Sequence, residues 1–119
     1  MNISSFKRHL LKIFNDTYLA VFYFGVKRLT IDVAANRITI VGEHARLPGL
    51  AALDESNRFV TRMTDVALLD ECKKRIKLAL EESMPEVKVR TILKDYDPST
   101  EITATVIVTE EPLNTLFEN

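Results

Sequence analysis

The residues that most often carry enzyme chemistry are few in this sequence, and they lie far apart. It contains two histidines, His9 and His44, and a single cysteine, Cys72. Nucleophilic catalysis needs a nucleophile, a base and a group that orients the base, and none of these residues lies in a motif of that kind. Cys72 falls on the apolar stripe of a predicted helix, where a free cysteine usually packs as a small core residue. We therefore predict no catalytic residues and no enzyme activity.

One run of oxygen-bearing side chains is similar to part of a metal site. Asp95, Asp97, Ser99 and Glu101 alternate along the chain like the start of a calcium-binding loop. An EF-hand loop also needs a glycine at its sixth position and a glutamate at its twelfth. Pro98 instead favours a tight turn with solvated carboxylates. The three glycines of the chain are too widely separated for a phosphate-binding loop, so we predict no metal and no cofactor.

The charge balance argues against nucleic acids and membranes as partners. Sixteen Lys and Arg residues stand against 17 Asp and Glu residues, which gives a net charge of −1. The basic clusters at residues 7–8 and 73–75 are interleaved with acids on predicted helices, as on a solvated face. No apolar run reaches the length of a membrane span, and a single cysteine fits a reducing compartment. We expect a cytoplasmic protein with no nucleic-acid partner and no membrane insertion.

The pattern of elements predicts one α+β domain over residues 1–119. Helical spacing of apolar residues predicts a first helix from Ser4 or Ser5 to about Phe24. A second helical region covers residues 54–84, and the sequence leaves open whether it is one bent helix or two.

Alternation of apolar and polar residues predicts two β-hairpins, one before the second helical region and one at residues 87–109. The element order is therefore α-β-β-α-β-β. The simplest arrangement is a two-layer α/β sandwich, in which a four-stranded, antiparallel-rich sheet carries both helices on one face. Residues 112–119 form a short tail, either frayed or docked on the core through its large apolar residues.

Alternation along residues 101–109 divides the predicted sheet into two faces. We expect the set formed by Ile102, Ala104, Val106 and Val108 to point toward the helices. The outer face would then carry Thr39, Val41, Ile92, Thr103, Thr105 and Ile107. An exposed face would normally carry more charge than these six residues provide, which suggests a surface that meets another chain. We therefore predict a homo-oligomer, most simply a dimer, with these residues at the interface. The alternative interface is a second apolar stripe on the first helix, formed by Leu11, Phe14 and Tyr18.

A second candidate site surrounds the apolar connection at residues 45–53. This segment is interrupted by Pro48-Gly49 and is able to fold over the core as a flap. A pocket beneath it would be lined by His44, Arg46, Leu47 and Leu50. The alternative to an interaction domain is thus a small-ligand-binding module, or a weak enzyme, that uses this pocket.

The closing part of the chain carries a recognisable pattern. Residues 87–89 (Val-Lys-Val) precede Asp-Tyr-Asp-Pro-Ser-Thr-Glu at residues 95–101, and a valine-rich strand ends at Val106–Val108. This order resembles the MpsC-like family, a small bacterial domain of unknown function named for a sodium-translocating, membrane-potential-generating system. The resemblance spans residues 6–111 and is best in this closing part. Residues 24–27 depart from it, because they read Phe-Gly-Val-Lys where the family has a Gly-Lys-Gly-Pro-like turn.

The resemblance implies a small cytoplasmic accessory domain without an established set of catalytic residues. We therefore expect a non-enzymatic accessory or regulatory domain that acts through self-association or protein partners. The same resemblance links it to a membrane cation-transport system.

Overall fold

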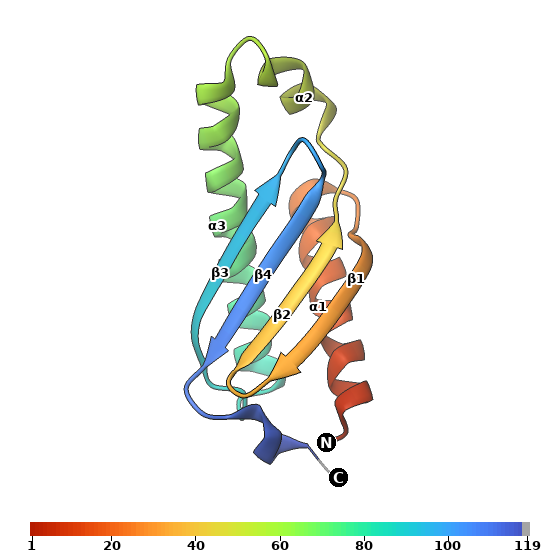
Figure 1. Ribbon diagram of the computed structural model, residues 1–119, viewed down its shortest axis with the longest axis vertical. Helices are drawn as coiled ribbons and strands as arrows, with labels where there is room; N and C mark the ends of the chain where they lie inside the picture. The colour runs from red at the N-terminus through yellow and green to blue at the C-terminus, as the bar shows by residue number, and fades with distance from the viewer. Residues whose placement is uncertain (118–119) are drawn as a thin grey trace.

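Four antiparallel strands form one sheet, and two long helices cover one of its faces (Figure 1). The computed structural model describes residues 1–117. In chain order, the elements are α1 (Ile3–Phe22), β1 (Lys27–Ala34), β2 (Arg37–Glu43), α2 (Pro48–Asp54), α3 (Arg58–Ser83), β3 (Val89–Asp97), β4 (Ile102–Thr109) and the short 3-10 helix η1 (Leu113–Leu116). The strand order is β1-β2-β4-β3. The predicted α+β class and its two-layer arrangement are confirmed, with α2 as an added short helix.

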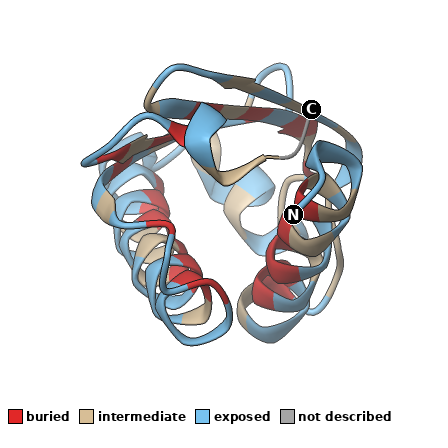
Figure 2. Ribbon diagram, turned by 90° about the horizontal axis from the view of Figure 1, so that it is seen from below, coloured by how far each residue is buried: buried red, intermediate tan, exposed pale blue. Residues whose placement is uncertain are grey.

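The core lies between the sheet and the two long helices. Figure 2 shows α1 and α3 beneath the sheet, with their buried sides turned toward the strands and toward each other. The largest buried core side chains come from both helices and the two central strands: Phe6, Leu10, Phe14, Tyr18, Ile38, Ile40, Ile76, Leu80 and Ile107. Each such side chain contributes about 1.5–3 kcal/mol on burial, so this one-sided layer supplies most of the driving force for folding.

The ends of α1 differ slightly from the prediction. The side chain of Asn2 accepts a hydrogen bond from the backbone N–H of Ser5 at 2.8 Å, so Asn2 is the N-cap in place of Ser4 or Ser5. The helix stops at Tyr23, whose φ of 70° is left-handed, before it reaches Phe24.

The second helical region and the tail are each resolved in favour of one alternative. The region before β3 contains one continuous long helix, α3, preceded by the separate helix α2. The tail docks on the core, because Leu113 is 1% exposed and the ring of Phe117 lies 5.1 Å from that of Phe6. Residues 118–119 of the predicted tail lie outside the described residues.

The two faces of β4 are the reverse of those predicted. Thr103, Thr105 and Ile107 point toward the helices, and at most 3% of each is exposed. On β3, Ile92 is buried on the same side, with 8% exposed. The sheet register explains the reversal, because Ile107 lies opposite the core residue Ile38. Both sets of alternating residues on β4 are rich in β-branched side chains, so alternation defines two faces without deciding which one is buried.

The buried threonines are tolerated because their hydroxyl groups have partners. The hydroxyl of Thr103 lies 3.0 Å from that of Tyr18, and Thr105 accepts a hydrogen bond from Nζ of Lys94 at 2.8 Å. Thr109 donates to the carbonyl of Glu111 at 2.7 Å. A buried hydroxyl without a partner would be costly, so these contacts allow a threonine-rich strand face to lie inside the protein.

Neighbouring residues on β4 test this assignment of faces. We expect Ile107→Ala to lower the free energy of unfolding by about 2–5 kcal/mol, because it leaves a cavity in the core. Val106→Ala, on the half-exposed outer side, should cost about 1 kcal/mol or less. Urea unfolding of the two variants beside the wild type measures the difference. An equal or larger loss in Val106→Ala would mean that the faces are assigned the wrong way round.

Candidate functional site

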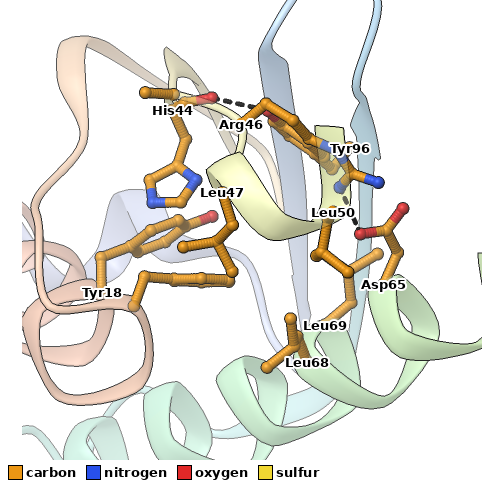
Figure 3. Close-up of a pocket in the computed structure, with 11 residues that line it drawn as sticks. Tyr18, His44, Arg46, Leu47, Leu50, Asp65, Leu68, Leu69 and Tyr96 are labelled. Atoms are coloured by element: carbon orange, nitrogen blue, oxygen red, sulfur yellow. Dashed lines mark hydrogen bonds and ion pairs between the residues drawn. The ribbon is translucent and has the colours of Figure 1, made fainter. Parts of the chain in front are cut away.

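The four residues of the predicted pocket do come together beneath α2. His44, Arg46, Leu47 and Leu50 line one cavity, whose other walls come from α1, α3 and β3 (Figure 3). The cavity volume accessible to water is about 20 Å³, which is room for about one water molecule. Typical small-molecule sites measure about 300–1,000 Å³. The flap is therefore closed over a space too small for an organic ligand.

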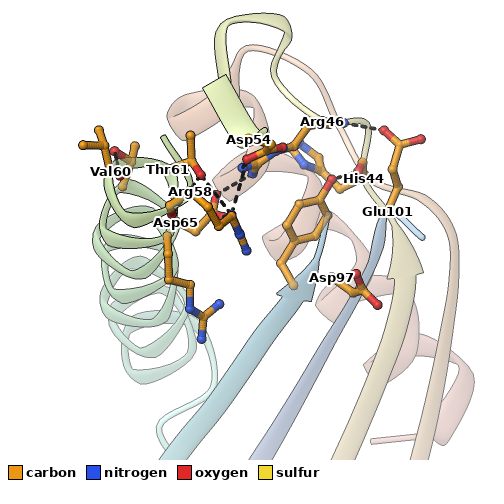
Figure 4. A network of polar contacts seen from close by, with 12 residues as sticks. His44, Arg46, Asp54, Arg58, Val60, Thr61, Asp65, Asp97 and Glu101 are labelled. Carbon is orange, nitrogen blue, oxygen red and sulfur yellow. Dashed lines mark hydrogen bonds and ion pairs between the residues drawn. The ribbon is translucent and has the colours of Figure 1, made fainter. Parts of the chain in front are cut away.

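An arginine clamp holds the flap in this closed position (Figure 4). The guanidinium of Arg46 donates two hydrogen bonds to Asp54 at the end of α2, at 3.0 and 2.7 Å, and one to Asp65 on α3. Its side chain is only 7% exposed and that of Asp65 only 4%. The hydrogen bonds from Arg46 lower the pKa of the Asp54 carboxyl to about 2. Paired, desolvated charges of this kind fix the position of α2 against α3.

Two further contacts extend the clamp. The backbone N–H of Arg46 donates to the carboxylate of Glu101, which ties the flap to the turn before β4. Arg58, at the start of α3, donates to Asp54 and Asp65, at 3.3 Å in each case. The clamp thus joins the flap and the start of α3 to the distant turn before β4, and both Asp54 and Asp65 have a cation as partner.

His44 serves packing rather than proton transfer. Its ring is 4% exposed and lies between the aromatic rings of Tyr18, Phe22 and Phe24, with ring centroids 4.4–4.8 Å away. Burial, helped by the nearby charge of Lys94, lowers the pKa of the imidazole to about 4. Among the described residues, its Nε2 atom has no hydrogen-bond partner. A neutral ring enclosed by aromatic side chains is a poor general base, so His44 supports the cavity wall.

Lys94 is the charged residue that sequence reasoning missed. Its ammonium group lies over the rings of Phe14 and Tyr18, 5.4 and 4.8 Å from their centroids, and donates to the hydroxyls of Thr103 and Thr105. No carboxylate among the described residues forms an ion pair with it. Burial lowers the pKa of Lys94 to about 8. Pairing β3 with β4 in the sequence would have placed Lys94 beside Thr105. Its burial would have followed only if the inner face of β4 had been assigned correctly.

The outer sheet face is the second site, and it differs in part from the prediction. Thr39 and Val41 lie on it, whereas Ile92, Thr103, Thr105 and Ile107 lie in the helix-covered layer. The apolar residues that do occupy the outer sheet face are Val41, Leu93, Ile102, Ala104, Val106 and Val108. No described element covers these side chains, as Figure 1 shows from the front. Leu93 is 60% exposed, Ile102 43% and Val41 38%.

The other candidate groups add no chemistry. Cys72 is fully buried, and burial raises the pKa of its thiol to about 11, which makes it a poor nucleophile. The described residues contain no group of three His, Cys, Asp or Glu side chains suited to a metal ion. Asp97 accepts hydrogen bonds from the backbone N–H and the hydroxyl of Ser99, as expected of a turn. None of the described helices is long and apolar enough to cross a membrane.

The clamp makes a clear prediction about stability. We expect Arg46→Met to lower the free energy of unfolding by about 3–5 kcal/mol, because it leaves the buried Asp65 carboxylate without its main partner. Arg28→Met is the matched control, since Arg28 pairs with Glu43 at 2.6 Å but its side chain is 80% exposed. That surface pair should be worth less than about 1 kcal/mol. Chemical unfolding measures the loss of free energy of unfolding in each variant. Similar losses in both variants would rule out a special role for Arg46.

Lys94 makes a prediction about pH. Its folded-state pKa of about 8 lies below the ordinary value of 10.5, so the folded protein binds this proton more weakly than the unfolded chain. The free energy of unfolding contributed by Lys94 should therefore rise as the pH increases from about 8 toward 10.5.

We expect Lys94→Met to lose this rise, because methionine carries no charge that titrates. Lys88→Met, at an exposed lysine, controls for loss of charge. Urea unfolding between pH 7 and pH 10 measures how the stability of each variant changes with pH. A Lys94→Met variant that keeps the wild-type rise above pH 8 would contradict the expectation.

Comparison with models of protein families, with curated proteins and with solved structures finds no match for this chain. Its function therefore has to be argued from the geometry of the clamp, the buried lysine and the outer sheet face.

Proposed function

We propose that this chain is a non-enzymatic accessory domain that works by associating with a second copy of itself through the outer sheet face. The observation that carries this function is the uncovered apolar surface on that face. An antiparallel sheet commonly has one packed and one solvated face, and the solvated face then alternates to polar residues. Here the solvated side of β4 carries Ile102, Ala104, Val106 and Val108, with no polar residue among them.

The contrast with the neighbouring strands strengthens this assignment. The outward residues of β2 include Arg37 and Glu43, and those of β3 include Asp95 and Asp97. Charged residues therefore flank an uncharged centre, which is the arrangement of a protein interface with an apolar core and a polar rim. A contiguous exposed apolar patch of this kind commonly marks an association surface.

The alternative function is the binding of a small ligand beneath α2. Its support is the convergence of His44, Arg46, Leu47 and Leu50 on one cavity. A ligand would have to displace α2, and that requires breaking the paired contacts of Arg46 with Asp54 and Asp65. The outer sheet face needs no such rearrangement, so it is the better supported site.

The wider setting rests on sequence features alone. The resemblance of residues 87–108 to the MpsC-like family supports a regulatory role alongside a membrane cation-transport system. The single cysteine supports a cytoplasmic location, and partner proteins of that system would be further candidates for the outer sheet face.

The solution mass of a matched pair of variants tests this function. We expect wild type to approach twice its chain mass of 13.6 kDa as concentration rises, and Val41→Lys to stay monomeric. Lysine at this position would place a desolvated charge in the apolar centre of the interface. Leu19→Lys is the control, because Leu19 on α1 is 50% exposed but lies on the other layer.

Light scattering over a range of concentrations, with circular dichroism to verify folding, provides the measurement. The Leu19→Lys variant should dimerise like wild type. A wild type that remains monomeric at millimolar concentration would contradict self-association. Equal loss of the dimer in both variants would exclude the outer sheet face as its interface.

A further inference from the structure

We propose that two copies pack sheet against sheet about a two-fold axis that runs across the strands, so that β4 of one copy lies antiparallel on β4 of the other. This arrangement rests on the proposed self-association and adds its geometry. The choice of axis follows from the sheet register, which gives the residues of β2 and β3 that lie beside each outward residue of β4. Residues side by side in this way are called a row.

The uncharged side of β4 determines which strands must face each other. Its outward residues, Ile102, Ala104, Val106 and Val108, are called here the β4 ridge. The outward sides of β2 and β3 both carry charges, so a β4 ridge packed on either strand would desolvate those charges against apolar side chains. Packing the β4 ridge on its own counterpart avoids this cost.

Two-fold symmetry then leaves two orientations. A symmetric dimer uses the same patch on both copies, and the axis of a face-to-face dimer lies in the plane between the two sheets. With β4 placed on β4, that axis runs either along the strand or across it. The sheet register distinguishes the two, because it gives the neighbours of each β4 residue on β2 and β3.

An axis along β4 brings acidic residues together. Glu43 and Asp97 are both paired with Ile102, so they lie in one row on opposite sides of β4. Rotation about β4 exchanges these sides and places Glu43 of one copy over Asp97 of the second copy. The next row likewise puts Val41 over Asp95, because both are paired with Ala104. The like charges of Glu43 and Asp97 disfavour this orientation, whereas Asp95 meets an apolar side chain under either axis.

An axis across the strands produces complementary contacts. It reverses the order of the rows, so that Ile102 lies over Val108 of the second copy and Ala104 lies over Val106. On β2, Glu43, which also pairs with Arg28 of its own copy, then lies over Arg37 of the second copy, since Arg37 is paired with Val108. Within the described residues Arg37 has no ion pair, so it is available for this contact.

On β3, Asp97 is matched in the same way, whereas Asp95 lies over Leu93 of the second copy, because these residues are paired with Ala104 and Val106. The row reversal brings Asp97 over the opposite end of β3 in the second copy, where Thr91 is paired with Val108 and the exposed Arg90 lies beside it. Arg90 also has no ion pair within the described residues. Antiparallel strands in packed sheets, turned by about 30° through sheet twist, are a common sandwich geometry.

The size of the face sets the expected affinity. Four strands spaced about 4.8 Å apart and about 27 Å long cover roughly 500 Å² per copy, or roughly 1,000 Å² in total. That area is at the lower limit of specific protein interfaces. We therefore expect a reversible dimer whose population depends on protein concentration.

Distances between spin labels distinguish the two axes. The probe is a nitroxide at Glu110→Cys, just beyond β4, and separately at Ser99→Cys in the turn before it; both positions are exposed and outside the β4 ridge. Across-strand symmetry places equivalent labels at opposite ends of the dimer, more than roughly 30 Å apart. Symmetry along β4 places them at the same end, less than roughly 25 Å apart. Cys72 is buried, and unsubstituted protein carried through the labelling controls for its reaction.

A charge-reversal variant provides an independent test of the axis. Arg37→Glu should raise the dimer dissociation constant about tenfold, because it opposes Glu43 of the second copy. Under symmetry along β4 the same residue lies over Thr91, and the constant should hardly change.

The outcomes separate the two levels of the proposal. Long distances from both labels, with a weakened Arg37→Glu dimer, support the across-strand axis. A dimer with short distances overturns that axis and leaves self-association standing. A wild type that never dimerises overturns both.

Discussion

The structure depends on one constraint: both long helices lie on the same face of the sheet. Each strand side chain consequently points either toward the helix-covered core or toward the open face of the sheet. The inner layer collects the large apolar side chains of α1 and α3, including Phe14 and Ile76. On the opposite face of the sheet, the outward residues of β4 are all apolar, as in a buried strand. A chain that folds in this way leaves apolar surface exposed, and the proposed dimer would bury it.

The helix side of the sheet also holds charged side chains. Lys94 lies over two aromatic rings without a carboxylate partner, and the Arg46 clamp buries two charged groups near the other end of the sheet. Both arrangements cost desolvation energy and recover part of it through hydrogen bonds or ion pairs. Their common effect is to hold elements in fixed positions: Lys94 links β3 to β4 and α1, and Arg46 links α2 to α3. Neither set of contacts involves the outer sheet face, which stays uncovered.

Several features could be predicted from residues alone. Helical spacing and period-two alternation were sufficient for the element order and the two-layer arrangement. The apolar, Pro-Gly-interrupted segment indicated a flap, and His44, Arg46, Leu47 and Leu50 do line a cavity under it. The side of β4 that faces the helices was not predictable in the same way. Its two sets of alternating residues are similarly rich in β-branched side chains, and burial of the threonine set depends on Tyr18 and Lys94, which are distant in sequence.

The sequence by itself determined the periodicities, and with them the class of fold, because hydrogen-bonding geometry ties each secondary structure to its own spacing of apolar residues. It also determined that two strand faces would exist on β4. Only the tertiary structure decided which face is buried, how large the cavity is and which carboxylates Arg46 contacts. These properties depend on strand register and on partners tens of residues away, such as Glu101 for Arg46. A local sequence pattern does not specify such contacts, because they form only when the helices pack on one side of the sheet.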